Sequence, residues 1–379
     1  MRNILFLMLL FLFGAGCVQH VRIEEKSVPG GLREYVLSNG EIACGTVPEA
    51  SGLLASFEYL PGKKVFFEPL DFSVERDDLL PTIVKTGATG ARELLWGTKR
   101  FHNLTMAVTG MTQTRDTVRI SMKQPFFSAS ALTAEKVLEL SAGSTGLDSY
   151  FTLTNPEKKP VTALLWCNII ARMGKKEMDP VLMPVKGGVY RVQNRAVTGF
   201  EKDLVYQEND HSQIDVFTAP GRPWIARFTR EFPGVLVMRC TTPGALGPGA
   251  RFYSYKRGER TMEFISAPVT LQPGKSYTWH IEYIFFPSLR TLRDVAGVYA
   301  IDRIDGKDET LLEIEACKPV AAGKVRIDSG EIFTLPAMKP GKVYRIRLRG
   351  SRKNKAISGT LPGNAQFCLN GLFTEKTAK

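Results

Sequence analysis

The residues best suited to chemistry are a carboxylate and a histidine in one β-prone segment. Glu263 stands between Met262 and Phe264 in the segment 261–287, and His280 follows further along it. A carboxylate and an imidazole are the groups that most often move protons in enzymes. The same groups also hydrogen-bond ligands without any turnover, so the segment indicates a site and leaves the reaction open.

Two strands must position these groups. Pro273-Gly274 is typical of a turn, so the segment predicts a strand on each side of it, with Glu263 rising from the same sheet as His280. Side chains alternate along a strand, and in the second strand one face is apolar: Tyr277, Trp279, Ile281, Tyr283 and Phe285. The other face begins polar, as at the floor of a groove, with Thr278, His280 and Glu282.

The whole chain favours an all-β class. It has 379 residues, with 34 Gly and 22 Pro, and strongly periodic helical segments are scarce. Short β-prone runs separated by turn signals, such as Asn39-Gly40 and Pro61-Gly62, extend to about residue 290. No fixed-period repeat is visible, which counts against propellers and solenoids. The pattern predicts a large β-sandwich or barrel.

A change in pattern near residue 290 predicts a second domain. Leu289, Leu292, Ala296 and Tyr299 have helix-like spacing, so we expect a linker or short helix over 291–304 between a large domain at 31–290 and an accessory domain at 305–379. Short strands in the second domain suit a small Ig-like β-sandwich. Residues 18–30 are polar and are expected to form a tether or a first edge strand.

The N-terminus has the features of an export signal. A positively charged start precedes the apolar run 4–13, which is shorter than the about 20 residues that span a bilayer. Gly14-Ala15-Gly16-Cys17 resembles the lipobox of bacterial lipoproteins, although Gly14 replaces the usual Leu. Residues 1–17 then form a lipoprotein-type signal peptide, and lipidated Cys17 anchors the chain in the cell envelope, on the outer side of the cytoplasmic membrane or in the outer membrane. The alternative is simple cleavage and secretion.

No metal or cofactor is expected from the sequence. The cysteines after Cys17 are odd in number and show no zinc-binding spacing: Cys44, Cys167, Cys240, Cys317 and Cys368. Buried free thiols are expected, with one disulfide as the alternative. The acidic cluster Glu208, Asp210 and Asp215 lacks the spacing of a calcium loop.

The positive charge of the chain is concentrated near its end. The net charge is +12, and the stretch 339–355 has eight Lys or Arg and no Asp or Glu. Arg345, Arg347 and Arg349 alternate with apolar residues, which predicts a strand with a basic outer face. This face either protects a solvated sheet edge or makes weak contact with anionic surfaces. No nucleic-acid-binding motif is present, so nucleic acid is not an expected partner.

The order of motifs over 31–287 resembles that of galactose mutarotase-like (aldose 1-epimerase) domains. The chain opens with Val47-Pro48-Glu49 and Gly62-Lys63-Lys64, continues with YFTLTNPEKKPVTALLWCN (150–168), and closes with MEFISAPVTLQPGKSYTWHIEYIFFP (262–287). The resemblance implies a β-supersandwich with a carbohydrate groove on one face.

The resemblance also assigns residues. Glu263 matches the family's general base, whereas Asn168 stands near the position of the histidine that acts as general acid. Because an amide cannot exchange protons near neutral pH, mutarotation needs another acid. Further candidates for sugar binding are Trp96, Arg100, His102, His211, Trp279 and His280. For the tryptophans the alternative is core packing, and for the residues in polar loops it is a solvated turn.

These residues leave three classes of function open. The first is an exported, lipid-anchored protein that binds a carbohydrate or glycan. The second is a sugar-active enzyme, epimerase-like or glycan-cleaving, that uses Glu263 as base with an unidentified acid. The third is a structural envelope protein. The missing histidine at Asn168 favours binding.

Overall fold

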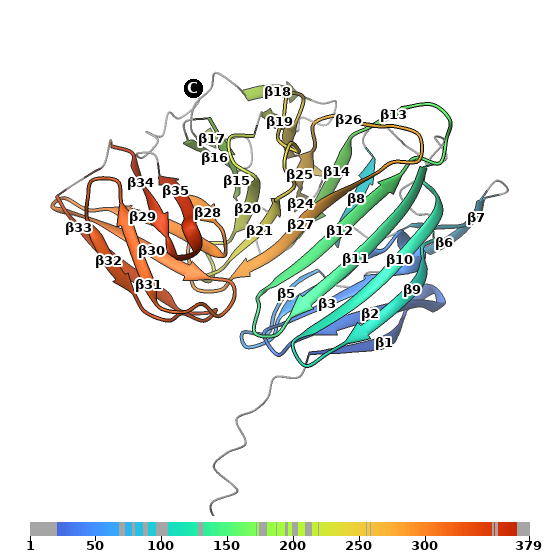
Figure 1. Cartoon of the computed structure of the whole chain (residues 1–379), viewed down its shortest axis with the longest axis horizontal. Coiled ribbons are helices and arrows are strands. Elements are labelled where there is room, and N and C mark those ends of the chain that lie inside the picture. Colours follow the sequence, from blue (N-terminus) through green and yellow to red (C-terminus); the bar gives the residue numbers. More distant parts are fainter. Residues whose placement is uncertain are drawn as a thin grey trace, which may run out of the picture.

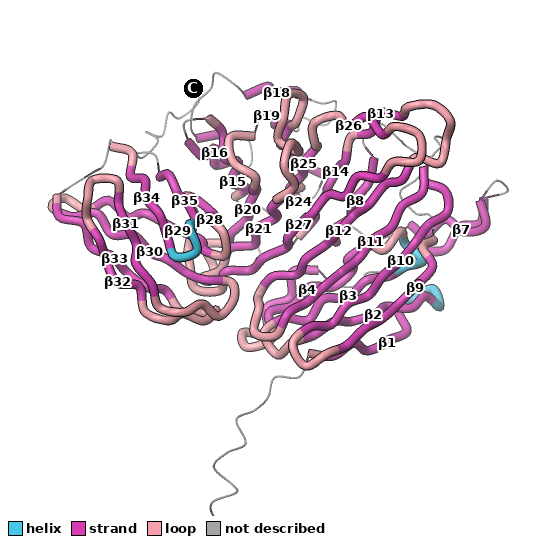
Figure 2. The backbone as a smooth tube through the Cα atoms, in the orientation of Figure 1, coloured by secondary structure: helices cyan, strands magenta, loops and turns pink. Residues whose placement is uncertain are grey.

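A computed structural model gives the fold. It describes residues 21–67, 73–77, 80–85, 90–95, 105–127, 132–171, 173, 180–186, 188–193, 196–198, 204–208, 214–218, 220–254, 256–257, 259–350, 352 and 355–369. Within these ranges the regular secondary structure is almost entirely strand, and the helical elements are three short 3-10 turns, η1 (Pro29–Gly31), η2 (Pro48–Ala50) and η3 (Pro362–Asn364). Figure 2 shows strands through the whole molecule. The predicted all-β class is confirmed.

An eleven-stranded antiparallel sheet forms one layer of the large domain. Its order is β1-β2-β3-β4-β8-β14-β25-β22-β19-β18, with β5 paired to β4. The strands are β1 (Arg22–Val28), β2 (Leu32–Ser38), β3 (Ile42–Val47), β4 (Leu53–Tyr59), β5 (Lys64–Phe67), β8 (Gly90–Leu95), β14 (Leu165–Ile170), β18 (Leu204–Glu208), β19 (Ile214–Thr218), β22 (Arg251–Ser254) and β25 (Met262–Ile265).

A ten-stranded antiparallel sheet forms the second layer, in the order β17-β16-β15-β20-β21-β27-β12-β11-β10-β9. Its strands are β9 (Ala107–Gln113), β10 (Thr117–Phe127), β11 (Leu132–Ser141), β12 (Gly146–Thr154), β15 (Val181–Val185), β16 (Gly188–Gln193), β17 (Ala196–Thr198), β20 (Trp224–Phe228), β21 (Val235–Cys240) and β27 (Ser276–Phe286). Two-stranded sheets pair β6 (Ser73–Asp77) with β7 (Leu80–Lys85), β13 (Val161–Ala163) with β26 (Val269–Leu271), and β23 (Lys256–Arg257) with β24 (Glu259–Arg260).

Period-two alternation packs the two sheets together. In β11, Leu132, Ala134, Leu138 and Leu140 are buried, and in β27 the predicted apolar face from Trp279 to Phe285 is buried as well. These side chains belong to one core between the sheets. The turn between β26 and β27 contains Gly274 with φ +68°, a conformation that glycine adopts without steric cost. The hydrophobic pattern of the strands therefore decides which faces meet.

The prediction that Glu263 shares a sheet with His280 is wrong. β25, which carries Glu263, lies in the eleven-stranded sheet, whereas β27, which carries His280, lies in the ten-stranded sheet. The chain leaves β25 after Ile265 and passes through Pro268, which has no N–H for a ladder. The strand β26, which pairs with β13, then leads across to the other layer.

A second, smaller β-sandwich follows. Its sheets have the orders β28-β29-β30-β33 and β32-β31-β34-β35, and they enclose a separate core. The strands are β28 (Asp294–Ala296), β29 (Tyr299–Asp305), β30 (Glu309–Ala316), β31 (Gly323–Ile327), β32 (Ile332–Leu335), β33 (Val343–Arg349), β34 (Ile357–Leu361) and β35 (Ala365–Leu369). In Figure 1 this sandwich, orange to red, lies against the end of β27 and β21.

The linker or short helix expected over 291–304 is instead two strands, β28 and β29. The helix-like spacing of apolar residues has another cause: Leu289 and Leu292 belong to a buried cluster between the small sandwich and the outer face of the ten-stranded sheet, which also contains Ile284 and Phe286. The spacing of Leu289 and Leu292 therefore reflects a contact between the two domains and not the period of a helix.

Three other expectations concern the ends of the chain and the cysteines. Residues 22–28 form an edge strand, β1, which pairs with β2, so this part of the predicted 18–30 tether belongs to the sheet. Cys44, Cys167, Cys240, Cys317 and Cys368 are all free thiols, and the first four are buried. Among the described residues, none of the helical elements has the length and hydrophobicity that a membrane span requires. The proposed lipidation residue, Cys17, lies outside the described residues.

The basic strand has the predicted geometry. In β33, Ile346 and Leu348 are buried, whereas Arg345, Arg347 and Arg349 are exposed. The strand lies at the edge of its sheet, and Arg345 donates to Glu313 on the neighbouring strand β30 at 2.8 Å. The charges therefore line an exposed edge, which is the arrangement expected of edge protection.

Candidate functional site

Polar and aromatic side chains form two rows across four strands of the eleven-stranded sheet. In the first row, Asn168 on β14 lies opposite Arg92 on β8 and Glu263 on β25, and Glu263 lies opposite Tyr253 on β22. In the second row, Trp166 lies between Leu94 and Ile265. Directly opposed residues on one sheet face have Cβ atoms about 4.5–5.5 Å apart, so these side chains are immediate neighbours.

The rows lie on the outer face of the sheet. The residues that alternate with them, Cys167, Met262 and Phe264, are buried in the core between the two sheets. Arg92, Trp166, Asn168 and Tyr253 are only partly buried. The period of the strands therefore turns this polar set away from the core.

Glu263 is the most enclosed member of the set. Its side chain is 2% exposed, and its Oε2 accepts a hydrogen bond of 2.6 Å from Nε1 of Trp166. This contact fixes the indole edge toward the carboxylate and leaves the ring partly exposed. A buried carboxylate must keep such donors, because an unpaired buried charge costs several kcal/mol (roughly 3–5 when one partner of a buried pair is lost).

The electrostatics of the rows are mixed. Burial lowers the pKa of Arg92 to about 10, so its guanidinium stays protonated at neutral pH. The face therefore offers a cation, a carboxylate, an amide and two aromatic rings within two adjacent rows. Aromatic faces flanked by hydrogen-bonding groups are the combination that sugar sites use. The described residues of this face include no histidine.

The structure brings together two of the predicted site residues and places Trp279 and His280 away from them. Asn168 and Glu263 are direct cross-strand neighbours. Trp279 is 0% exposed in the core, at 4.7 Å between ring centroids from Tyr277, so its prediction as a sugar platform is wrong. His280 is partly exposed on the outer face of the other sheet, away from Glu263. Trp96, Arg100, His102 and His211 lie outside the described residues.

A second polar cluster, missed from the sequence, lies between the two sheets. Glu93 Oε2 accepts from Lys136 Nζ at 2.5 Å, and Glu93 Oε1 accepts from Ser149 at 2.6 Å and Tyr283 at 2.8 Å. Lys136 also donates to the carbonyl of Gly52 at 2.7 Å. Burial raises the pKa of Glu93, but the charge of Lys136 and these hydrogen bonds outweigh it and lower the pKa below its usual value.

This cluster had a signal in the sequence. Lys136 occupies a position in β11 where the period-two pattern of Leu132, Ala134 and Leu138 calls for an apolar residue. Glu93 stands in the same way between Ala91 and Leu95 in β8. Opposite charges at core positions of two strands predict a buried ion pair. Which two charged residues meet depends on how the strands are arranged in the fold.

Comparison with solved structures defines the class of fold. A galactose mutarotase-like protein from Clostridium acetobutylicum superposes with a TM-score of 0.51 at 8% identity, over 70% of this chain and 98% of that one. A putative mutarotase from Salmonella typhimurium gives 0.48 at 8% identity, over 69% and 93%. A putative aldose 1-epimerase from Klebsiella pneumoniae gives 0.47 at 12% identity, over 69% and 83%. At TM-scores below 0.5, the last two add nothing to the assignment.

The chain therefore contains a two-layer β-supersandwich, and its fold is galactose mutarotase-like. The fold predicted from the order of motifs is confirmed. No protein-family model matches the sequence, and no curated protein matches it either. The identity to the solved structures is low, so the likeness extends to the fold alone.

Proposed function

We propose that this protein binds a carbohydrate on the outer face of its eleven-stranded sheet. The observation that carries the proposal is the register of β14 and β25, which sets Asn168 beside Glu263 on a face that also holds Trp166 and Tyr253. A pyranose needs donors and acceptors for its hydroxyl groups and a flat apolar surface for its C–H face. This set supplies both.

Binding without turnover is the better-supported form of this function. Epimerisation at an anomeric carbon needs a base for the hydroxyl proton and an acid for the ring oxygen. Glu263 is placed to act as a base, but its direct neighbour Asn168 cannot donate a proton near neutral pH. His280, the histidine in the described part of the chain, lies on the other sheet. Among the residues that the structure describes, the row therefore holds no histidine to serve as that acid.

Glu263→Gln tests this proposal. The amide keeps the size of the side chain, and its oxygen can still accept from Trp166, so we expect the fold to survive. On a glycan array followed by titration of the best ligand, binding should weaken by about 1 kcal/mol, roughly fivefold, because an amide still hydrogen-bonds hydroxyls. Neither protein should turn the sugar over.

Two results would contradict the proposal. Robust epimerisation or cleavage by the parent, reduced about 10²–10⁴-fold in Glu263→Gln, would identify an enzyme with Glu263 as general base. Absence of any glycan ligand for the folded parent would remove the carbohydrate function itself.

We also propose that the chain is exported and anchored through lipid on Cys17, as the residues before this cysteine indicate. Cys17→Ala should abolish lipid labelling and release the protein from membranes, and equal retention of both proteins would rule the anchor out.

The exposed Arg345, Arg347 and Arg349 supply a weaker contact. Residual adsorption of Cys17→Ala to anionic vesicles should be salt-sensitive and should fall when all three become Gln.

A further inference from the structure

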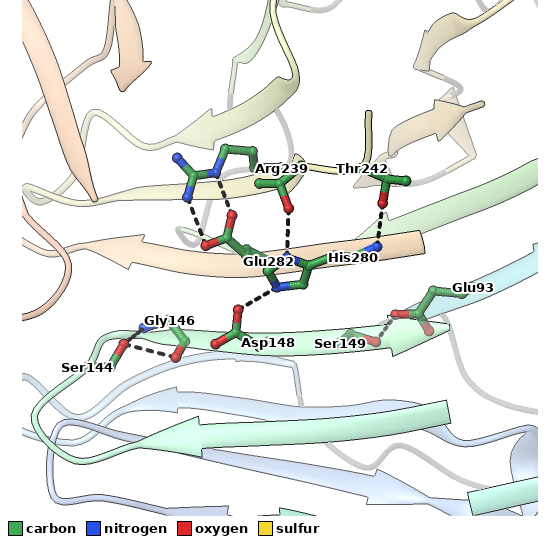
Figure 3. Close-up of polar contacts among 10 residues, drawn as sticks. Glu93, Ser144, Gly146, Asp148, Ser149, Arg239, Thr242, His280 and Glu282 are labelled. Atoms are coloured by element: carbon green, nitrogen blue, oxygen red, sulfur yellow. Dashed lines mark hydrogen bonds and ion pairs between the residues drawn. The ribbon is translucent and has the colours of Figure 1, made fainter. Parts of the chain in front are cut away.

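Three metal-ligating side chains meet on the outer face of the ten-stranded sheet. Asp148 lies on β12, and His280 and Glu282 lie on the neighbouring strand β27, where Asp148 is directly opposite Glu282. One ligand atom from each lies within 4.8 Å of the others. Figure 3 shows the imidazole of His280 pointing at the carboxylate of Asp148, with Glu282 beside it on the same strand.

The imidazole of His280 is held by contacts on three sides. Its Nε2 lies 2.6 Å from Asp148 Oδ1, and its Nδ1 lies 2.7 Å from Thr241 Oγ1. The ring of Tyr150 stacks on it with centroids 4.4 Å apart and an interplanar angle of 9°. The ring is therefore fixed with Nε2 directed into the cluster, and the hydroxyl oxygen of Thr241 is placed to accept a hydrogen bond from Nδ1–H.

Glu282 is oriented by a cation. Nε and Nη2 of Arg239 donate to its two oxygens at 2.6 and 2.8 Å, and Nη1 of Arg239 donates to the carbonyl of Gly297 in the small sandwich. Each carboxylate oxygen has two lone pairs, so Glu282 can accept from Arg239 and still offer an electron pair to an ion. A ligating carboxylate that is itself hydrogen-bonded is the usual outer-shell arrangement of metal sites.

We propose that Asp148, His280 and Glu282 bind a divalent transition-metal cation of the zinc class. The ligands are Nε2 of His280 and one oxygen from each carboxylate, which leaves one position of a tetrahedral ion for water. In the metal-bound form the imidazole carries its proton on Nδ1, and this N–H donates a hydrogen bond to the hydroxyl oxygen of Thr241. The imidazole favours zinc over calcium or magnesium, which take oxygen ligands.

The spacing of the cluster fits such an ion after a small adjustment. Bonds of about 2.0–2.2 Å in a tetrahedron place ligand atoms roughly 3.4 Å apart. The present separations run from 2.6 Å between His280 and Asp148 to 4.8 Å at most, so they bracket this value. The side chains are 28%, 28% and 18% exposed for Asp148, His280 and Glu282, which gives an ion access from solvent.

Residue spacing could not predict this site, because only the spacing His280-x-Glu282 is local. Asp148 is 132 positions from His280, and the two meet through the pairing of β12 with β27. A search for ligand spacings along the chain therefore cannot find a site that is built across strands.

Isothermal titration of the full chain, free of any histidine tag, with zinc chloride tests the proposal. We expect one zinc per chain in the parent and binding reduced to background in His280→Ala. Thr241→Val should weaken binding about 10–100-fold, the usual cost of losing an outer-shell partner. Glu135→Gln is the matched control: Glu135 is an exposed carboxylate on the neighbouring strand β11, paired with Lys123 at 2.7 Å, and its loss should change nothing.

Thermal unfolding with and without zinc gives a second readout, since an ion that binds the folded state raises its melting temperature. The rise should be present in the parent and in Glu135→Gln, and absent in His280→Ala. Equal zinc binding in the parent and in His280→Ala would overturn the proposal, as would an absence of binding in the parent. Tighter binding of calcium than of zinc would also overturn it.

Discussion

Glu93 and Glu263 are buried carboxylates on opposite faces of the same eleven-stranded sheet. Glu93 lies inside, where Lys136, Ser149 and Tyr283 donate to it and are themselves buried. Glu263 lies on the outer face, where its donor Trp166 and its cross-strand neighbour Asn168 are partly exposed.

The difference shows that burial alone does not separate a structural carboxylate from a functional one. Both residues are almost fully enclosed, at 2% exposure each. What differs is the exposure of the partners: no ligand can reach the groups around Glu93, whereas the groups around Glu263 are open to solvent. We therefore propose a structural role for the first cluster and ligand recognition for the second.

The largest effect is expected from Lys136→Met, which leaves Glu93 without its cation. Removing one partner of a buried pair costs about 3–5 kcal/mol, so the variant should lose that much unfolding free energy in urea. Lys123→Met is the control, because Lys123 pairs with Glu135 at a similar 2.7 Å but both are about half exposed. Exposed pairs contribute about 0–1 kcal/mol. Equal costs for the two variants would contradict the structural role of the inner cluster.

A third buried carboxylate, Glu315, extends the comparison to the pH dependence of folding stability. Glu315 on β30 accepts hydrogen bonds from the backbone N–H groups of Ser288, Leu289 and Gly341, which connect the small sandwich to the end of β27. Burial raises its pKa to about 7, although these N–H groups lower it. Glu93, with a cation beside it, has a lowered pKa.

The two carboxylates should therefore act on stability in opposite directions. With a raised pKa, the contribution of Glu315 is complete below about pH 4.5 and is lost as pH rises toward 7, by at most about 1.4 kcal/mol per pH unit. The contribution of Glu93 is present above about pH 4.5 and is lost as pH falls below it.

Urea unfolding of the parent and Glu315→Gln at pH 5 and pH 7.5 measures the pH-dependent contribution of Glu315 to stability. The difference in stability between the two proteins should change with pH, in favour of the variant at pH 7.5. A difference that is the same at both pH values would show that Glu315 keeps an ordinary pKa.

The sequence predicted the local structure where period and turn chemistry decide it. The alternation from Tyr277 to Phe285, the Pro273-Gly274 turn and the basic strand at Arg345 all depend on neighbours within a few residues. The order of motifs also predicted Asn168 and Glu263 as members of one site, and the two residues are direct cross-strand neighbours.

The errors arose where distant packing decides the outcome. Leu289 and Leu292 have helix-like spacing because both pack into the contact between the two domains. Trp279 is in the core because β27 is the centre of its sheet, and Glu263 is in another sheet because the chain crosses layers between β25 and β27. The pair of Lys136 with Glu93 spans 43 positions, and no local pattern specifies such a partner.

The most direct test of the central claim asks which outer face holds the sugar. Asn168→Ala changes the outer face of the eleven-stranded sheet, and Thr278→Ala changes the outer face of the ten-stranded sheet, where the hydroxyl of Thr278 bonds that of Thr152 at 2.8 Å. In calorimetric titration with the best ligand from the array, Asn168→Ala should weaken binding by about 1 kcal/mol or more, roughly fivefold or beyond, and Thr278→Ala should match the parent. Parent-like binding by Asn168→Ala with loss of binding in Thr278→Ala would contradict the account.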